Sequence, residues 1–256
     1  MEPRDAATVL LIRDAPDLQV FMLRRNLQSV FAAGAYVFPG GAVDPDDGDD
    51  VLGVDDASAG GDTGVPARFR VAAIREAFEE AGVLLARDAT TGEPVDVASL
   101  SAARQSLHRG DGSFTEIVGD LGVVLDTGSL WPIGRFITPP GAPRRFDTWF
   151  FVAPAPDGHA YRHDDGETVA SLWIGPDAAL DRSRHGEFEL IEPTRWTLEL
   201  IARYPRVAPL FDAIRAAWRA PSPLEERSRD RGWMLRVGDQ SRPQRDDRPQ
   251  RRETTA

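Results

Sequence analysis

The 256-residue sequence contains no cysteine and no lysine. Without cysteine, the chain has no disulfides, no thiolate metal site and no cysteine nucleophile. Without lysine, it lacks Schiff-base chemistry and the Walker-type phosphate loop. All 30 basic residues are therefore arginines. Any side-chain cation that recognises a phosphate must be an arginine, whose planar fork suits phosphate oxygens.

Long apolar runs and excess positive charge are also missing. No run approaches the roughly 20 residues of a membrane span, and the charged segment 1–5 does not resemble a signal peptide. The net charge of -11 argues against nonspecific duplex binding. We therefore expect a cytoplasmic protein without a membrane or nucleic-acid partner. A small phosphorylated substrate is still compatible with the negative net charge, because a bound cation reverses the sign of the electrostatic field around it.

Hydrophobic periodicity predicts a mixed α/β domain. Helices are expected at 66–81, 194–204 and 207–219, with less regular helical segments at 96–109 and 113–125. Gly82 suits a left-handed cap after the first helix. This order predicts one domain over residues 1–220 with helices on both sides of a sheet. The expected strands are 7–13, 18–24, 130–137, 146–153 and 167–174.

Two stretches fall outside this pattern. Residues 44–62 carry eight aspartates and no basic residue, which predicts a solvated acidic insertion at about 43–65. Beyond Pro221 the composition turns to Arg, Asp, Gln and Pro. We expect 221–256 to be a largely disordered tail, with 233–235 as a short docking patch, so that truncation after Pro221 leaves stability nearly unchanged.

Three glutamates of the first helix carry the strongest chemical signal. Glu76, Glu79 and Glu80 are spaced i, i+3 and i+4, so their carboxylates share one helix face. Three like charges on one face are costly unless a cation neutralises them, and Mg²⁺ prefers carboxylate and water oxygens. Arg75 lies four residues before Glu79 and can pair with it. The alternative is an ordinary solvated acidic face.

The string Arg75-Glu76-Ala77-Phe78-Glu79-Glu80-Ala81-Gly82-Val83 resembles the second half of the Nudix box, and Phe38-Pro39-Gly40-Gly41 resembles its opening. The resemblance implies a Nudix-type α/β/α sandwich with a mixed sheet and, here, extra C-terminal helices. It further implies that Gly40 and Gly41 form the loop before the helix. By the same resemblance, Glu76, Glu79 and Glu80 bind Mg²⁺ or Mn²⁺, with Arg75 orienting one of them.

The sequence departs from the box in two ways. About 20 additional residues separate Gly41 from Arg75, and Ala67 stands where the family has an earlier glutamate. The missing glutamate calls the support of the loop into question more than the metal site. The long acidic insertion is itself similar to the branch that includes the peroxisomal coenzyme A and acyl-CoA diphosphatases. Three further segments are similar to the same branch: Arg24-Arg25, 145–151 and 192–194.

Further candidates lie outside the box. Arg144 and Arg145, beside a proline-rich turn, are candidates for the extra 3′-phosphate of coenzyme A, and Arg135 is a weaker one. Asp147, in an apolar strand, is expected to have a buried partner, with Arg145 close in sequence. Glu167 and Glu116 are candidates for a base or an additional ligand, and the alternative for both is a surface residue. Trp149, Phe150 and Phe151 are expected in the core.

These observations predict metal-dependent hydrolysis of a diphosphate in a nucleoside diphosphate derivative. The favoured substrate is coenzyme A or an acyl-CoA, yielding adenosine 3′,5′-bisphosphate and a phosphopantetheine. The alternatives are an ADP-ribose- or NADH-type dinucleotide pyrophosphatase and a catalytically weak nucleotide-binding regulator. The sequence is compatible with a homodimer and does not give the oligomeric state. Catalysis is assigned to Arg75, Glu79, Glu80 and Glu167; substrate binding is assigned to Arg24, Arg25, Gly40, Gly41, Arg144 and Arg145.

Overall fold

A mixed sheet built around the N-terminal strand β1 (Arg4–Asp14) organises the molecule in the computed structural model. The structure describes residues 2–28, 32–48, 63–95, 97–164, 166–221, 223–228 and 232–236. β1 pairs in parallel with β8 (Phe146–Pro154) and antiparallel with β2 (Leu18–Arg25). The strand order is β10-β11-β7-β8-β1-β2-β3, with β4 paired to β1 and β9 paired to β2.

The remaining strands are short or lie toward the edges. In the large sheet they are β3 (Tyr36–Val37), β4 (Gly40–Ala42), β7 (Trp131–Ile137), β9 (Thr168–Ile174), β10 (Leu224–Ser228) and β11 (Gly232–Leu235). A separate antiparallel pair is formed by β5 (Ala86–Asp88) and β6 (Val123–Leu125), and a 3-10 turn spans Thr127–Ser129.

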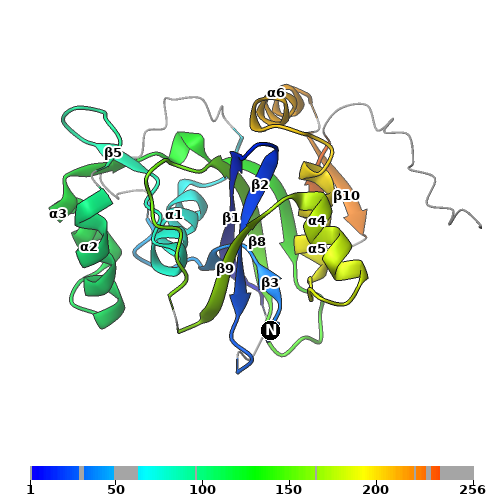
Figure 1. Ribbon diagram of the computed structural model, residues 1–256, viewed down its shortest axis with the longest axis horizontal. Helices are drawn as coiled ribbons and strands as arrows, with labels where there is room; N and C mark the ends of the chain where they lie inside the picture. The colour runs from blue at the N-terminus through cyan, green and yellow to red at the C-terminus, as the bar shows by residue number, and fades with distance from the viewer. Residues whose placement is uncertain are drawn as a thin grey trace, which may run out of the picture.

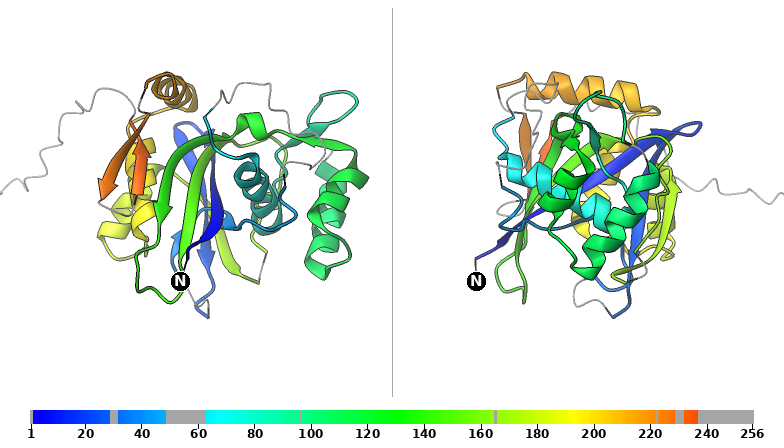
Figure 2. Two further views of the ribbon diagram at one scale, coloured as in Figure 1. Left: turned by 180° about the vertical axis from the view of Figure 1, so that it is seen from behind. Right: turned by 90° about the vertical axis from the view of Figure 1, so that its left-hand side faces the viewer.

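Helices cover both faces of the large sheet, as the sequence predicts (Figures 1 and 2). One face carries α1 (Ala67–Ala81), α2 (Val97–Arg109) and α3 (Phe114–Leu121). The other carries α4 (Pro176–Arg184), α5 (Glu192–Ile201) and α6 (Val207–Trp218). No helix in the described ranges is long and apolar enough to cross a membrane.

β1 supplies both cores because its side chains alternate between the two faces of the sheet. Val9 and Leu11 pack against the core under α1, whereas Leu10 and Ile12 pack against the core under α5 and α6. All four side chains are at most 1% exposed, and burying each contributes about 1.5–3 kcal/mol. β1 is therefore fixed from both sides, and it is the strand against which β4 and Val43 are held.

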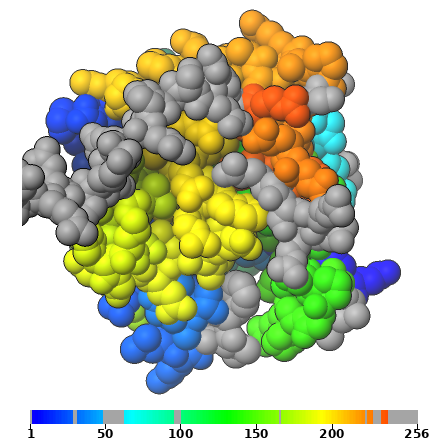
Figure 3. Space-filling view, turned by 90° about the vertical axis from the view of Figure 1, so that its right-hand side faces the viewer, coloured from blue at the N-terminus to red at the C-terminus, as the bar shows by residue number. Residues whose placement is uncertain are grey.

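Part of the tail differs from the expected disorder, whereas the docking patch expected at 233–235 is confirmed and lies within β11. β10 and β11 form an antiparallel pair, and β11 adds to the sheet beside β7 and next to α6 (Figure 3). Met234 and Leu235 are each 2% exposed. The apolar residues are too few to predict a strand by composition, but an existing sheet edge supplies the hydrogen-bonding partner. Residues 237–256 and 49–62 lie outside the described residues.

Truncation after Pro221 is therefore expected to lower the melting temperature by at least ~5 °C, because it removes two buried side chains and uncovers the β7 edge. Differential scanning calorimetry measures this. A second truncation after Arg236 isolates the contribution of β10 and β11. Equal melting temperatures for the two truncated proteins would contradict the expectation and show that β10 and β11 do not stabilise the fold.

Candidate active site

The glycines of β4 allow this strand to lie against both β1 and α1. A Cβ added at Gly40 would lie 2.6 Å from the Ala7 carbonyl oxygen, and one at Gly41 would lie 2.6 Å from Glu76 Cδ. Phe38, 3% exposed, anchors the segment in the core under α5. Gly40 is thus required by the close approach of β1, and Gly41 by the close approach of the Glu76 carboxylate of the helix.

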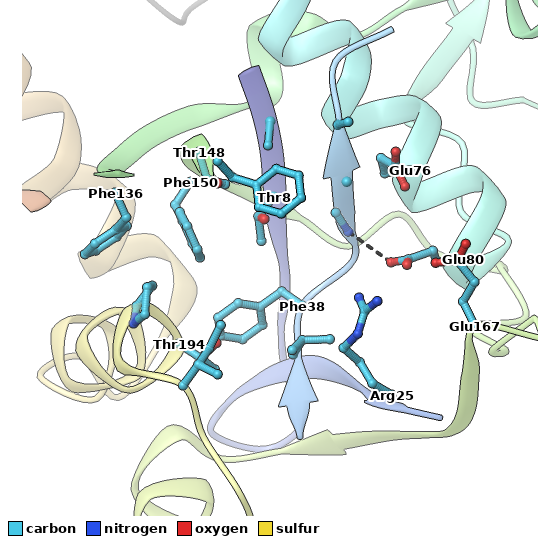
Figure 4. A pocket seen from close by; sticks show the side chains of 18 of the residues that line it. Thr8, Arg25, Phe38, Glu76, Glu80, Phe136, Thr148, Phe150, Glu167 and Thr194 are labelled. Atoms are coloured by element: carbon cyan, nitrogen blue, oxygen red, sulfur yellow. Dashed lines mark hydrogen bonds between the residues drawn. The ribbon is translucent and has the colours of Figure 1, made fainter. Parts of the chain in front are cut away.

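Helix α1 presents two buried carboxylates to this strand. Glu76 is 9% exposed and Glu80 5% exposed, and Glu80 Oε2 accepts a hydrogen bond of 3.0 Å from the Gly40 N–H (Figure 4). The helix ends as the sequence predicts, because Gly82 adopts a left-handed conformation with φ 69°. The part of the helix face that carries Glu76 and Glu80 is therefore turned toward β4, whereas Glu79 is partly exposed.

Arg75 connects the helix to the loop that follows β4. Its guanidinium is 3.0 Å from both Asp47 carboxylate oxygens, 2.9 Å from Glu76 Oε1 and 3.3 Å from Glu79 Oε1. It also donates to the Ala42 carbonyl oxygen at 2.8 Å. Bidentate arginine–carboxylate pairs of this kind fix geometry as well as charge. Arg75 is 6% exposed, so this network lies inside the protein.

Asp47 corrects the expectation that the whole acidic stretch is solvated. It is 1% exposed, pairs with Arg75 through both oxygens and accepts the Asp44 N–H at 2.7 Å. Ala67 leaves the family's earlier glutamate missing, and Asp47 supplies a carboxylate that supports this loop. Among the described aspartates of this run only Asp47 is buried, and the sequence does not single it out because its burial depends on the distant Arg75.

The buried glutamates repel each other. Burial raises the pKa of Glu76 to about 7, and the charges of Glu79 and Glu167 act in the same direction against the opposing charge of Arg75. Burial and the charge of Glu76 raise the pKa of Glu80 well above its usual range, while the Gly40 hydrogen bond and Arg25 oppose this. Burial alone would lower the pKa of Arg75, but Asp47, Glu76 and Glu79 raise it instead.

The donor chemistry of this cluster fits a hard divalent cation. Glu76 and Glu80 are buried, lie beside each other and carry unfavourable negative charge that a cation would neutralise. Glu79 is turned toward Arg75. Within the described residues, no three acidic or histidine side chains already converge as a preformed metal site. The residues that could hold a cation are thus Glu76, Glu79 and Glu80, with Glu167 facing the same region (Figure 4).

One cavity of about 980 Å³ joins this acidic cluster to an aromatic wall. In Figure 4 Glu76, Glu80, Glu167 and Arg25 lie on one side, and Phe38, Phe136 and Phe150 lie on the other. The Phe136 ring centroid is 5.0 Å from that of Phe150 and 5.6 Å from that of Trp196. The pocket therefore has a charged end and an apolar end. The candidate residues in its lining are Arg25, Gly40, Gly41, Arg75, Glu76, Glu79, Glu80, Arg144 and Glu167.

Several candidates from the sequence have other roles. Arg24 and Arg145 are outside the cavity lining; Arg24 Nε donates to the Gly34 carbonyl oxygen at 3.4 Å, and Arg145 Nε donates to the Thr138 carbonyl oxygen at 2.9 Å. Asp147 pairs with Arg135 of the neighbouring strand, at 2.8 and 2.6 Å, and not with Arg145. Glu116 completes a capping box at the start of α3. The partner of Asp147 is thus decided by the pairing of β7 with β8 and not by short sequence distance.

The aromatic wall, Arg104 and His108 were not assigned to the site from the sequence. Phe150 is buried, at 5% exposed, as the sequence predicts, but it also lines the cavity together with Phe136 and Trp196. Arg104 and His108 come from α2 and bond the backbone of Glu79. No local pattern signals such residues, because they are brought to the site only when α2 packs against α1.

Replacing Gly41 with alanine is expected to lower kcat about 10-fold, since the new methyl group must displace the Glu76 carboxylate and small misplacements at a reacting centre are costly. Steady-state kinetics and circular dichroism measure the effect on activity and fold. Gly119→Ala is the matched control, because a Cβ at Gly119 meets no atom within 4 Å. Equal activity of the two variants would show that Gly41 does not constrain Glu76.

Comparisons with known proteins agree with this geometry. A family model described as the NUDT19 Nudix domain matches residues 51–200. The acyl-coenzyme A diphosphatases NUDT19 of Gallus gallus and Homo sapiens are 27% and 26% identical, over 76% and 77% of this chain. The crystal structure of a NUDIX hydrolase from Alicyclobacillus acidocaldarius is similar with a TM-score of 0.69, at 31% identity, over 83% of this chain and 96% of that one.

A nudix hydrolase relative from Caenorhabditis elegans is 30% identical over 202 residues, which is 78% of this chain. The chain spans 61% of the length of that protein, and 67% and 64% of the avian and human proteins. The similarity to the curated relatives therefore covers most of this chain and about two thirds of theirs.

Proposed function

The chain belongs to the Nudix hydrolase family, in the NUDT19-type group, and we propose that it hydrolyses the diphosphate of coenzyme A or an acyl-CoA. The products would be adenosine 3′,5′-bisphosphate and a phosphopantetheine or its acyl derivative. One observation carries the proposal: a single cavity joins a buried acidic cluster to an aromatic wall. The charged end of the cavity suits the diphosphate in the middle of such a substrate, and the apolar end suits its less polar arm. The names of the avian and human relatives support the same substrate class.

Nudix hydrolases generally use divalent metal ions, and here Glu76, Glu79 and Glu80 would hold Mg²⁺ or Mn²⁺. A bound divalent cation polarises a phosphate oxygen and lowers the pKa of a bound water. Glu167 faces the same region and is our candidate for the base that receives a proton from the attacking water (Figure 4). Arg75 keeps Glu76 and Glu79 in place through the contacts described above.

Arg25 is suited to a phosphate oxygen of the diphosphate. Its side chain points into the cavity toward the acidic cluster (Figure 4), and its Nε is buried without a hydrogen-bond partner among the described residues. A buried donor without an acceptor costs about 1–3 kcal/mol. An anionic oxygen from the substrate would satisfy it with a charge-assisted bond. This supports an anionic substrate, whose diphosphate would lie between Arg25 and the glutamates.

A substrate panel tests the proposed function. The protein is incubated with CoA, acyl-CoA, ADP-ribose, NADH and dinucleoside polyphosphates, with Mg²⁺, Mn²⁺ or EDTA, and products are identified by mass. We expect adenosine 3′,5′-bisphosphate from CoA or acyl-CoA and no product in EDTA. Turnover confined to ADP-ribose or NADH would overturn the coenzyme A assignment. Tight nucleotide binding without turnover would support a regulator.

Arg144 is our candidate for reading the 3′-phosphate of coenzyme A, because it lines the cavity, is exposed and has no ion pair with a described residue. A charge-assisted bond to a phosphate contributes about 1.5–3 kcal/mol. Arg144→Ala should therefore raise the KM for CoA at least ~10-fold, and the KM for dephospho-CoA much less. The matched control is Arg145→Ala, whose side chain is outside the lining. Equal losses on the two substrates would show that Arg144 does not read this phosphate.

A further inference from the structure

The backbone carbonyl oxygen of Glu79 is bound by two side chains of α2. Arg104 donates to it through Nε at 2.9 Å and Nη2 at 2.7 Å, and His108 Nε2 lies 3.0 Å from it. The last carbonyls of a helix have no partner within the helix. At the end of α1, the Gly82 N–H donates to the Phe78 carbonyl oxygen and the Val83 N–H donates to the Ala77 carbonyl oxygen. Arg104 and His108 therefore satisfy the carbonyl of a residue whose own side chain belongs to the acidic cluster.

Arg104 also contacts the segment that leads to Glu167. Its Nη1 donates to the Arg162 carbonyl oxygen at 3.1 Å, and the Arg162 N–H in turn donates to the Ala81 carbonyl oxygen at 3.1 Å. Asp164, two residues later, accepts the Glu167 N–H at 3.0 Å. A single guanidinium thus joins the C-terminal end of α1 to the segment that leads to Glu167, which also lines the cavity.

The glycine cap of α1 makes this contact sterically feasible. A Cβ at position 82 would lie 2.9 Å from Arg104 Nη1, so the guanidinium occupies the space beside a residue without a side chain. The planar guanidinium fork donates to two carbonyl oxygens at once. Its Nε and Nη2 bond the Glu79 carbonyl oxygen, and its Nη1 bonds the Arg162 carbonyl oxygen. An ammonium group is a compact point charge and cannot reproduce that fork.

We propose that Arg104, assisted by His108, is a positioning residue of the active site. It fixes the backbone of Glu79 relative to that of Arg162, so that the α1 carboxylates and Glu167 face the same part of the cavity. Its role lies outside the Nudix box and belongs to this chain's own α2. The kinetic part of the test rests on the proposed function, whereas the backbone part does not.

Arg104→Gln tests this proposal, with Arg109→Gln as the matched control. Arg109 lies on the same helix and, among the described residues, pairs with Asp111 alone, at 2.6 Å. We expect Arg104→Gln to lower kcat at least ~10-fold with KM changed less than ~2-fold, because misplaced reacting groups affect chemistry more than binding. Arg104→Lys should recover part of kcat. Arg109→Gln should match the wild type.

Two further measurements separate positioning from general stability. In metal-free protein, hydrogen exchange at the Gly82, Val83 and Arg162 amides should accelerate in Arg104→Gln and not in Arg109→Gln. In a Glu167→Gln background, Arg104→Gln should lower kcat by a smaller factor than in the wild type, because part of its effect acts through Glu167. Unchanged kcat, equal loss in Arg109→Gln or full additivity with Glu167→Gln would overturn the proposal.

If the wild-type protein turns over no member of the panel, the proposed function fails but this inference is still judged. Hydrogen exchange and the Mn²⁺ dissociation constant, measured by electron paramagnetic resonance, then decide it. Faster exchange at Gly82 and Arg162 with weaker Mn²⁺ binding in Arg104→Gln supports the positioning role. Unchanged exchange and unchanged Mn²⁺ affinity overturn it.

Discussion

Glu80→Gln is expected to lower kcat at least ~100-fold while the metal-free protein becomes no less stable. The loss corresponds to about 3 kcal/mol of transition-state stabilisation. Glutamine keeps the oxygen that accepts the Gly40 N–H but removes a charge that a hard cation requires. Stability is spared because Glu80 is 5% exposed and its charge is desolvated beside Glu76, so the folded protein no longer has to bury that charge.

The opposite responses of activity and stability make this prediction specific. Activity is measured on the substrate found in the panel, and the melting temperature is measured in EDTA. Glu93→Gln is the matched control, because Glu93 is exposed and outside the cavity lining. Near-normal turnover in both Glu80→Gln and Glu79→Gln would remove the metal assignment. A marked loss of metal-free stability would show that the Glu80 charge has a favourable partner in the fold.

The parts of the site that were predictable from the sequence are those set by local geometry. The spacing of Glu76, Glu79 and Glu80 fixes a common helix face whatever the helix packs against, and Gly82 ends the helix by its own conformational freedom. The β1 alternation and the helices over both faces follow from periodicities that extend through whole elements.

The parts that were not predictable depend on contacts between segments far apart in the chain. Asp47 is buried because Arg75, 28 residues later, binds it. Asp147 pairs with Arg135 because the antiparallel pairing of β7 with β8 brings the two side chains together. β11 is a strand because β7 offers a free edge. Arg104 illustrates the same limit, since nothing in its own sequence neighbourhood indicates that it will bond the backbone of a catalytic-helix residue.

Arg75→Gln should have the largest effect on the stability of the fold. Arg75 is 6% exposed and contacts Asp47, Glu76, Glu79 and the Ala42 carbonyl oxygen. Removing one partner of a buried ion pair leaves an uncompensated charge and typically costs about 3–5 kcal/mol. Asp47, at 1% exposed, would keep both oxygens buried without their cation. We therefore expect the free energy of unfolding to fall by about 3–5 kcal/mol in urea titrations.

The double variant Arg75→Gln with Asp47→Asn shows whether that cost arises from the stranded carboxylate. Because the amide is neutral, the double variant should be more stable than Arg75→Gln alone, although the loop after β4 loses its support. Arg68→Gln is the matched control: Arg68 lies on the same helix and pairs with Asp5 at 3.1 Å, but both side chains are more than 40% exposed. Exposed pairs contribute only about 0–1 kcal/mol, so this control should unfold almost like the wild type. A loss in Arg75→Gln no larger than in Arg68→Gln would mean that the buried network does not hold β4 against α1.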